Sequence, residues 1–287
     1  VIIAANSGGA WSPLGDVTTT MLWIGGQITA LNIMKELFLP SLVSMLVPPA
    51  YLTWRMNGSI PKPVGLKLES SPVSTVESIV MFGLGLGMLL FVPVFKTITH
   101  LPPYMGMLLA LGVMWVASEI LHSGKDDEEK EPLTAAYALT RIDTPSILFF
   151  LGILIAIGAL EATGLLRSLA TSLDQAIGNQ DLIVVIIGVA SAVIDNVPLV
   201  AAAMGMYPLD QFPPDAKLWE FLAYCAGTGG SLLIIGSAAG VAVMGMERIG
   251  FLWYLRRISL LALLGYVAGV LTYLGIYALL HGGRLVS

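Results

Sequence analysis

The stretch Leu182-Ile-Val-Val-Ile-Ile-Gly-Val-Ala-Ser-Ala-Val-Ile-Asp-Asn-Val-Pro-Leu-Val-Ala-Ala-Ala-Met-Gly-Met-Tyr207 decides the fold. It is apolar except around Asp195-Asn196, with Pro198 just after this break. The arms on either side have 13 and 11 residues, and a membrane-spanning helix needs about 20. We therefore predict a hairpin over 182–207 that enters the membrane and leaves on the same side.

Two further apolar stretches contain polar breaks. The stretch 1–30 is interrupted at Asn6-Ser-Gly-Gly and at Pro13-Leu-Gly-Asp, and the stretch 218–246 is interrupted at Gly227-Thr-Gly-Gly. Non-helical backbone at membrane depth is tolerated only where it is buried in protein or lines a wet cavity. The three breaks therefore mark the expected functional site.

Composition places the remaining sequence in a membrane as well. Of 287 residues, 56% are hydrophobic and 11% are charged, whereas soluble domains carry about 25% charged residues. There is no basic patch for nucleic acid, and the single cysteine excludes an internal disulfide and a cysteine-based metal site. We expect no cofactor. Uncharged or nearly uncharged runs predict five spans, at Leu37–Trp54, Ser78–Phe95, Leu101–His122, Thr144–Leu160 and Ile258–Leu280.

The basic residues predict an orientation. Nine of the 14 Lys and Arg residues lie in the loops 55–75 and 123–143 and in the loop after Met246. Cytoplasmic loops are enriched in these residues, so we assign all three loops to the cytoplasmic side. This count holds when 182–207 is treated as a hairpin that does not cross.

An internal repeat connects the two broken helices. A shift of 221 residues lays Ala5-Asn-Ser-Gly-Gly-Ala over Ala226-Gly-Thr-Gly-Gly-Ser and Gly15-Asp16 over Gly236-Ser237. Broken segments at matching positions of two halves indicate a transporter binding site. We predict that 1–54 ends a first inverted repeat, that 55–75 is a cytoplasmic linker and that 76–287 is the second repeat. By the same shift, a first-half hairpin is expected before Val1.

Asp195 and Asn196 are the first candidates for ion binding. A carboxylate within an apolar membrane segment is costly and usually functional, and hard cations prefer carboxylate, amide, hydroxyl and carbonyl oxygens. Ser191 lies one helical turn before Asp195. The alternative is that Asp195 only caps the returning helix, with Pro198 in its first turn. The two roles are compatible.

Asp16 is the second carboxylate candidate, followed by the hydroxyls of Thr18 and Thr19. It either contributes to ion coupling or caps the helix that follows. Thr228 and Ser231 belong to the other break. Small hydroxyl residues often only pack between membrane helices. The sequence therefore leaves two roles open for Thr228 and Ser231, ion ligand or packing residue.

Three long runs resemble the NhaD-type sodium/proton antiporters of the ion transporter superfamily. They are Ala4-Ala-Asn-Ser-Gly-Gly-Ala-Trp-Ser-Pro-Leu-Gly-Asp-Val-Thr-Thr-Thr, Ser191-Ala-Val-Ile-Asp-Asn-Val-Pro, and Cys225-Ala-Gly-Thr-Gly-Gly-Ser. The resemblance implies an all-α polytopic fold with inverted repeats, re-entrant hairpins and broken helices, often in a homodimer. It also implies that family positions tied to cation exchange are Asp16, Thr18, Thr19, Ser191, Asp195, Asn196 and Ser231.

These observations predict a secondary transporter, not an enzyme, that exchanges Na⁺ or Li⁺ for H⁺ across a lipid bilayer. Na⁺ would bind at Asp195, Asn196 and Asp16. We expect the bacterial inner membrane, with a plastid envelope as the alternative. Rival functions are a dicarboxylate or arsenite carrier on the same fold, and an intramembrane aspartyl protease with Asp16 and Asp195 as its dyad.

Overall fold

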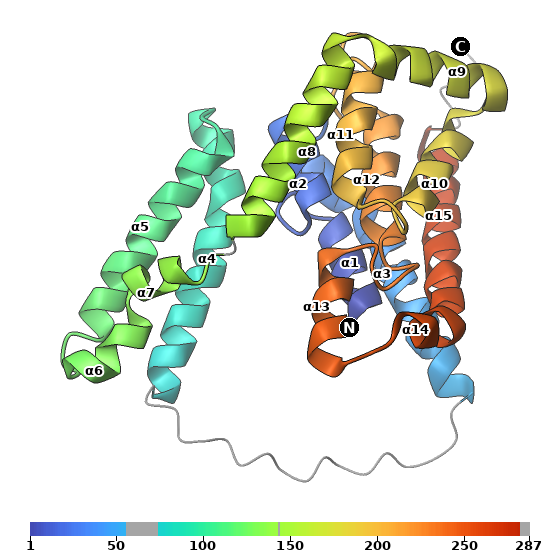
Figure 1. Cartoon of the computed structure of the whole chain (residues 1–287). Coiled ribbons are helices and arrows are strands. Elements are labelled where there is room, and N and C mark those ends of the chain that lie inside the picture. Colours follow the sequence, from blue (N-terminus) through green and yellow to red (C-terminus); the bar gives the residue numbers. More distant parts are fainter. Residues whose placement is uncertain (56–73, 143, 282–287) are drawn as a thin grey trace. The chain divides into compact units, whose positions relative to one another are not determined.

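The computed structural model describes residues 1–55, 74–142 and 144–281. All regular structure in these ranges is helical (Figure 1). The chain divides into two compact units, one of residues 1–57 and 149–287 and one of residues 58–148. The all-α prediction is confirmed.

The smaller unit is built on two long apolar helices, α4 (Thr75–Thr99) and α5 (Pro103–Leu121). A capping box of Ser74 and Glu77 starts α4. The two helices approach closely, since a Cβ built on Gly106 would lie 2.7 Å from the Phe95 ring. Three short elements follow, namely α6 (Asp127–Lys130), η1 (Glu131–Leu133) and α7 (Ala135–Thr140).

The larger unit contains a pair of packed long helices, α3 (Ala30–Arg55) and α15 (Ser259–His281). Gly265 and Gly269 stand one turn apart on α15, and Cβ atoms built on them would lie within 3 Å of the Ser44 and Pro40 carbonyl oxygens of α3. Small residues at such spacing let membrane helices approach closely. This explains how α3 packs tightly although it contains three prolines, which membrane helices tolerate.

The predicted spans are all helical. In the part of the chain that the structure describes, four helices are long and apolar enough to cross a membrane: Ala30–Arg55, Thr75–Thr99, Pro103–Leu121 and Ser259–Leu280. The fifth predicted span corresponds to α8 (Thr144–Ala162). Its segment Leu151–Ala162 is bent by 76° from the next helix, α9 (Leu165–Ile177). The chain is a polytopic integral membrane protein.

The predicted hairpin forms two short helices. They are α10 (Gln180–Ala190), capped by Asn179, and α11 (Asn196–Met206), separated by the break Ser191–Asp195. Each has 11 residues, or roughly 16 Å at 1.5 Å per residue, about half the hydrocarbon thickness. The helix–break–helix pattern is confirmed, and re-entry on one side of a membrane stays a prediction.

Both predicted broken helices are present. The first consists of α1 (Ile2–Ala10) and α2 (Val17–Ile24), and the second of α12 (Lys217–Gly229) and α13 (Ala238–Glu247). The short helix α14 (Phe251–Arg257) joins α13 to α15. Buried along almost its whole length, α12 contacts α1, α2, α3, α10, α11 and α15, and forms the centre of the larger unit (Figure 1).

The two repeats proposed from the sequence do not coincide with the two compact units of the structure. Contacts join 149–287 to 1–57, whereas the repeat assigns 76–287 to one half. Most of the predicted linker 55–75 lies outside the described residues. The division into inverted repeats therefore stays a prediction.

Candidate ion-binding site at two helix breaks

The first break is a tight loop between α1 and α2. Asp16 is the extended N-cap of α2, with φ −143° and ψ 154°. Gly9 and Gly15 let the two ends of the loop touch, because a Cβ built on Gly9 would lie 2.6 Å from the Gly15 carbonyl oxygen. The glycines noticed in the sequence are thus required by close backbone approach.

The second break has the same backbone form 221 residues later. Ser237 is the extended N-cap of α13, with φ −152° and ψ 154°. A Cβ built on Gly230 would lie 2.6 Å from the Gly236 carbonyl oxygen. Each of these positions is the repeat partner of one in the first break. The internal repeat found in the sequence therefore extends to the local backbone geometry.

The two breaks cross and contact each other. Asn6 of α1 donates from its side-chain nitrogen to the Ser237 hydroxyl over 3.0 Å. In the reciprocal place, Gly227 of α12 faces the other cap, and a Cβ built on it would lie 3.7 Å from an Asp16 carboxylate oxygen. Each broken helix therefore meets the cap of the other, as a pseudo-twofold arrangement requires.

The Asp16 carboxylate is the point where the hairpin joins this crossing. The Asn196 side-chain nitrogen, at the start of α11, donates to Asp16 Oδ2 over 3.2 Å. The Thr18 hydroxyl donates to the same oxygen. The Asp16 side chain makes no capping bond to α2, and its Oδ2 accepts from Thr18 and Asn196 instead. Asp16 therefore occupies the N-cap position of α2, but its side chain does not cap the helix.

Asp195 lies beside this group and has a clear structural role. Its carboxylate accepts from the Val197 amide over 3.3 Å and so caps α11, as the capping interpretation predicted. It is half-buried. Capping by one oxygen leaves the other oxygen for an ion, so both proposed roles remain compatible.

The other predicted residues are buried, and their hydroxyls bond to main-chain oxygens. Thr19 donates to the Asp16 carbonyl over 2.9 Å. Ser191 donates to the Gly188 and Ala226 carbonyls at 2.7 and 3.3 Å, which links α10 to α12. The structure therefore brings Thr19 to the first break, as a backbone brace, and Ser191 to the α10–α12 crossing.

Thr228 and Ser231 brace the second break. Thr228 donates to the Tyr224 carbonyl and Ser231 to the Thr228 carbonyl, each over 2.6 Å. The Ser231 carbonyl in turn accepts from the Tyr254 hydroxyl over 2.8 Å. Neither hydroxyl bonds to Asp16 or Asp195. Of the two readings left open for these residues, this geometry favours the packing role.

Glu220 in α12 is a further buried acid, which was not predicted from the sequence. Glu220 is buried and accepts from Asn32 of α3 and, over 2.8 Å, from the Tyr273 hydroxyl of α15. It ties the N-terminal end of α12 to both long helices. The sequence did contain a signal for this residue, because Glu220 is the only charged residue in the apolar stretch 218–246. The Asn6–Ser237 bond was also missed, although the repeat pairs Ser237 with Asp16.

Oxygen atoms suited to a small hard cation therefore converge from two segments that are far apart in the sequence. They come from Asp16 and Thr18 after the first break and from Asp195 and Asn196 at the hairpin tip. Carboxylate, hydroxyl and amide oxygens are the ligands that such cations prefer. Helices α2 and α11 both begin at this point, and the partial positive charge at their N-termini offsets some of the negative charge of the carboxylates.

Comparison with known proteins decides the family. The family model described as citrate transporter matches residues 1–227. The chain belongs to this citrate transporter family. The chain is also 31% identical over 301 residues to the Na⁺/H⁺ antiporter NhaD of Alkalimonas amylolytica, with 97% of the chain and 60% of that protein covered. The NhaD-type resemblance is confirmed.

Two plant proteins are more similar to the chain than this bacterial relative. Sodium/proton antiporter 1 of Arabidopsis thaliana is 56% identical over 281 residues, which cover 97% of the chain and 48% of that protein. Sodium/proton antiporter 2 of the same plant is 51% identical over 284 residues, with 96% and 66% covered. The chain thus spans about half to two thirds of the length of the curated relatives it matches.

Proposed function

We propose that the chain carries part of the ion site of a secondary transporter that exchanges Na⁺ for H⁺. The observation that carries this proposal is the Asn196–Asp16 hydrogen bond. It joins the tip of a membrane hairpin to the cap of a broken helix, 180 residues apart in the sequence. Such junctions between discontinuous helices are where transporters of this kind bind ions.

The proposed mechanism is competition for one carboxylate group. Asp195 is the first candidate and Asp16 the second, since both lie at helix breaks beside neutral oxygen ligands. Binding of a proton to the carboxylate weakens its affinity for Na⁺, and binding of Na⁺ weakens its affinity for a proton, because each neutralises the charge that attracts the other. Alternating exposure of the site to the two sides of the membrane then couples the two gradients.

A carrier of citrate or another carboxylate is the second candidate, because the matching family model is described as citrate transporter. A multivalent anion is usually bound by basic side chains, in addition to helix N-termini such as those of α2 and α11. The three segments 1–30, 182–207 and 218–246 contain no Lys or Arg, and they contain Asp16, Asp195 and Glu220. This charge pattern favours a cation. Citrate uptake that requires these acids would reverse the assignment.

An aspartyl protease is disfavoured on geometry. A proteolytic dyad needs two carboxylates that share one proton. Here the Asp16 carboxylate accepts from Thr18 and Asn196, and the Asp195 carboxylate caps α11. The chemistry supported by these contacts is ion binding, and the family is one of transporters.

Further features of the proposal rest on the resemblance. Li⁺ as a second substrate and a homodimeric assembly follow from it. For the membrane, the higher identity to the Arabidopsis proteins than to the bacterial NhaD protein favours the plastid alternative over a bacterial inner membrane.

Vesicles made with the complete protein that contains this chain test the function directly. An imposed pH gradient should dissipate on addition of Na⁺, and citrate should cause no comparable change. The matched control is the same protein with Asp16 and Asp195 both replaced by Asn. Dissipation at the wild-type rate in that control would remove the proposed site, and dissipation by citrate alone would favour the carboxylate carrier.

A further inference from the structure

Glu220 is a buried carboxylate that the proposed ion site does not use. It lies near the start of α12 and is 4% exposed. Asn32 of α3 donates to its Oε1, and the Tyr273 hydroxyl of α15 donates to its Oε2 over 2.8 Å. Both donors are neutral, and no ion pair involves Glu220 within residues 1–55, 74–142 and 144–281. A buried carboxylate without an ion-pair partner is costly unless something neutralises it.

Ionisable side chains reach this region from only some of the helices that pack against α12. Helices α1, α2 and α11 contain none. The ionisable groups of the other packed helices near this end, and of the segment before α12, are Lys35 and Glu36 of α3, Asp181 of α10, Tyr273 and Tyr277 of α15, and Asp215. Lys35 pairs with Glu36 over 3.3 Å, and Lys217 of α12 pairs with Asp181 over 2.6 Å. Both lysines near this end of α12 are thus paired with other acids.

The Tyr273 hydroxyl lies between two acceptors. Its oxygen is 2.8 Å from Glu220 Oε2 and 3.3 Å from the carbonyl oxygen of Lys217, the first residue of α12. A tyrosine hydroxyl has one hydrogen to donate, and its oxygen can also accept. With Glu220 charged, that hydrogen points to the carboxylate. With Glu220 protonated, Glu220 can donate to Tyr273, whose hydrogen then turns to the Lys217 carbonyl. Both protonation states of Glu220 are therefore hydrogen-bonded.

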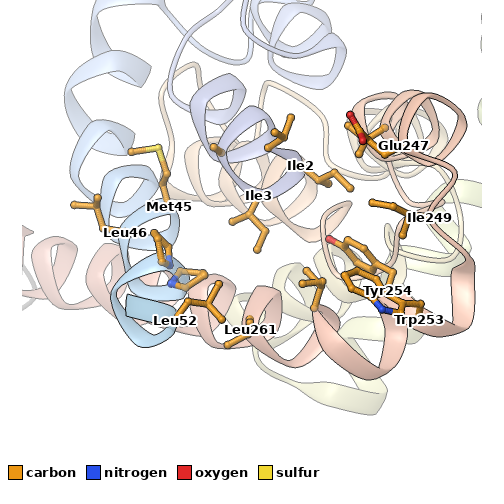
Figure 2. A pocket seen from close by; sticks show the side chains of 16 residues that line it. Ile2, Ile3, Met45, Leu46, Leu52, Glu247, Ile249, Trp253, Tyr254 and Leu261 are labelled. Carbon is orange, nitrogen blue, oxygen red and sulfur yellow. The ribbon is translucent and has the colours of Figure 1, made fainter. Parts of the chain in front are cut away.

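Water has access to this cluster at the N-terminal end of α12, where the Lys217 side chain is 30% exposed. An apolar groove lies elsewhere on the larger unit, and Figure 2 shows side chains such as Leu46 and Trp253 around it. Glu220, Tyr273 and Lys217 are not among the residues that line the groove. The orientation predicted from the basic residues places the Lys217 end of α12 on the non-cytoplasmic side. A proton is therefore expected to reach Glu220 from that side.

We propose that Glu220 is a second proton-binding site, separate from Asp16 and Asp195, which takes up a proton from the non-cytoplasmic side. The proton binds to Glu220 Oε2, and the Tyr273 hydrogen turns from that oxygen to the Lys217 carbonyl. When the proton returns to water, the Tyr273 hydrogen turns back. No covalent bond other than the O–H bond of Glu220 forms or breaks.

The position of Glu220 on α12 gives this proton a place in exchange. Glu220 precedes Gly227 by seven residues, or roughly 10 Å at 1.5 Å per residue, and Gly227 faces the Asp16 carboxylate. Glu220 is therefore a stage between the non-cytoplasmic water and the ion site. This use of the proton rests on the proposed Na⁺/H⁺ exchange, whereas proton binding at Glu220 does not.

Infrared difference spectra between high and low pH test proton binding directly, on the purified complete protein that contains this chain. The wild type should show the carbonyl stretch of a protonated carboxylic acid at Glu220, and Glu220→Gln should lose this band. Gln can accept from Asn32 and donate to Tyr273 as protonated Glu220 does, so α12 should keep its contacts. Identical difference spectra for the two proteins would overturn the proposal, whether or not the protein exchanges Na⁺.

Two tyrosine variants test the switch of hydrogen-bond partner. Tyr273→Phe removes the acceptor of protonated Glu220, so the carbonyl band should move to higher frequency. Tyr266→Phe is the matched control, because its hydroxyl belongs to the same helix and donates to the Val185 carbonyl. It should leave the band unchanged. Equal band positions in both variants would contradict the assignment of Tyr273 as the partner of the bound proton.

The pH profile of exchange separates a proton stage from a structural anchor. Below the pH midpoint of the infrared band, Glu220 is neutral in the wild type, so Glu220→Gln should exchange Na⁺ at the wild-type rate. Above that midpoint the variant should be severalfold slower, because it cannot take up and release the proton. A rate ratio that is constant across pH would leave Glu220 as an anchor of α12 and overturn its role in exchange. Absence of exchange in the wild type at every pH would instead contradict the proposed function.

Discussion

The two helix breaks share one backbone and differ in chemistry. At both, a pair of glycines closes the loop and an extended N-cap residue starts the next helix. The cap is a charged Asp16 in the first break and a neutral Ser237 in the second. Asp16 bonds to Thr18 and to Asn196 of the hairpin, whereas Ser237 caps α13 and bonds to Asn6.

This difference separates what the repeat specifies from what the ion requires. The glycines and extended caps are common to both copies, so they serve the shape of a broken membrane helix. The carboxylate is present in only one copy, so it serves a role that the shape does not need. We therefore expect substitutions at the first break to impair ion exchange more than substitutions at the second.

The largest expected effect comes from making the first cap like the second. Asp16→Ser gives the first break the same cap residue as the second and removes the carboxylate proposed to hold the cation, so exchange should fall by roughly 100-fold, or about 3 kcal/mol. Ser237→Ala loses a cap and the hydrogen bond from Asn6, at about 1 kcal/mol of stability each, but it removes no charge and should exchange normally. Rates are measured as Na⁺-dependent pH change in vesicles of the complete protein. Equal losses in both variants would break the comparison.

A similar loss is expected for Asp195→Asn, which tests capping against charge. Asn caps helices about as well as Asp, so α11 should form and the protein should insert normally. Exchange should nevertheless fall by roughly 100-fold, as for Asp16. Thermal stability and exchange are measured together. Full exchange in a stable Asp195→Asn protein would leave Asp195 as a cap only.

The competition mechanism predicts an intermediate, graded effect of pH. Below the pKa of the shared carboxylate, the protonated fraction rises as pH falls, so protons displace Na⁺. Apparent Na⁺ affinity should then weaken about tenfold for each pH unit and each competing proton. The measurement is the half-saturating Na⁺ concentration across pH. A constant value over the active range would require separate sites for the two ions.

The smallest effect concerns the hydroxyls. Thr18→Val removes a hydrogen bond to the carboxylate and should weaken apparent Na⁺ affinity by roughly fivefold, or about 1 kcal/mol. Thr19→Val is the matched neighbour, because its hydroxyl bonds to a carbonyl, and it should change affinity less. Ser231→Ala should also weaken Na⁺ binding, but less than Thr18→Val, since its hydroxyl bonds to Thr228. The reverse order would assign the ligand role to the second break.

Much of the fold followed from the sequence because membranes impose few solutions. Apolar length predicted the spans, and the short arms around Asp195 predicted the hairpin helices α10 and α11. Glycine pairs at repeat distance predicted both breaks. These features depend on local composition and chain length, which a single sequence contains.

The site was only partly predictable because contacts across 180 or more residues have no local signal. The bonds Asn196–Asp16 and Asn6–Ser237 depend on how broken helices cross. Hydroxyl roles were also undecidable from spacing, since Thr18 and Thr19 are adjacent but bond to a carboxylate and a carbonyl. Glu220 was overlooked, although an isolated acid in an apolar stretch was a usable signal.

The crossing of Asn6 with Ser237 and of Gly227 with Asp16 has an evolutionary consequence. A duplicated element that keeps its backbone in both copies can change the side chains of one copy while the other preserves the framework. Substrate choice then depends on a few positions at the crossing, and the helices around them need no redesign. Such a scaffold fits a chain that matches a family model described as citrate transporter and is also similar to proteins named as sodium/proton antiporters.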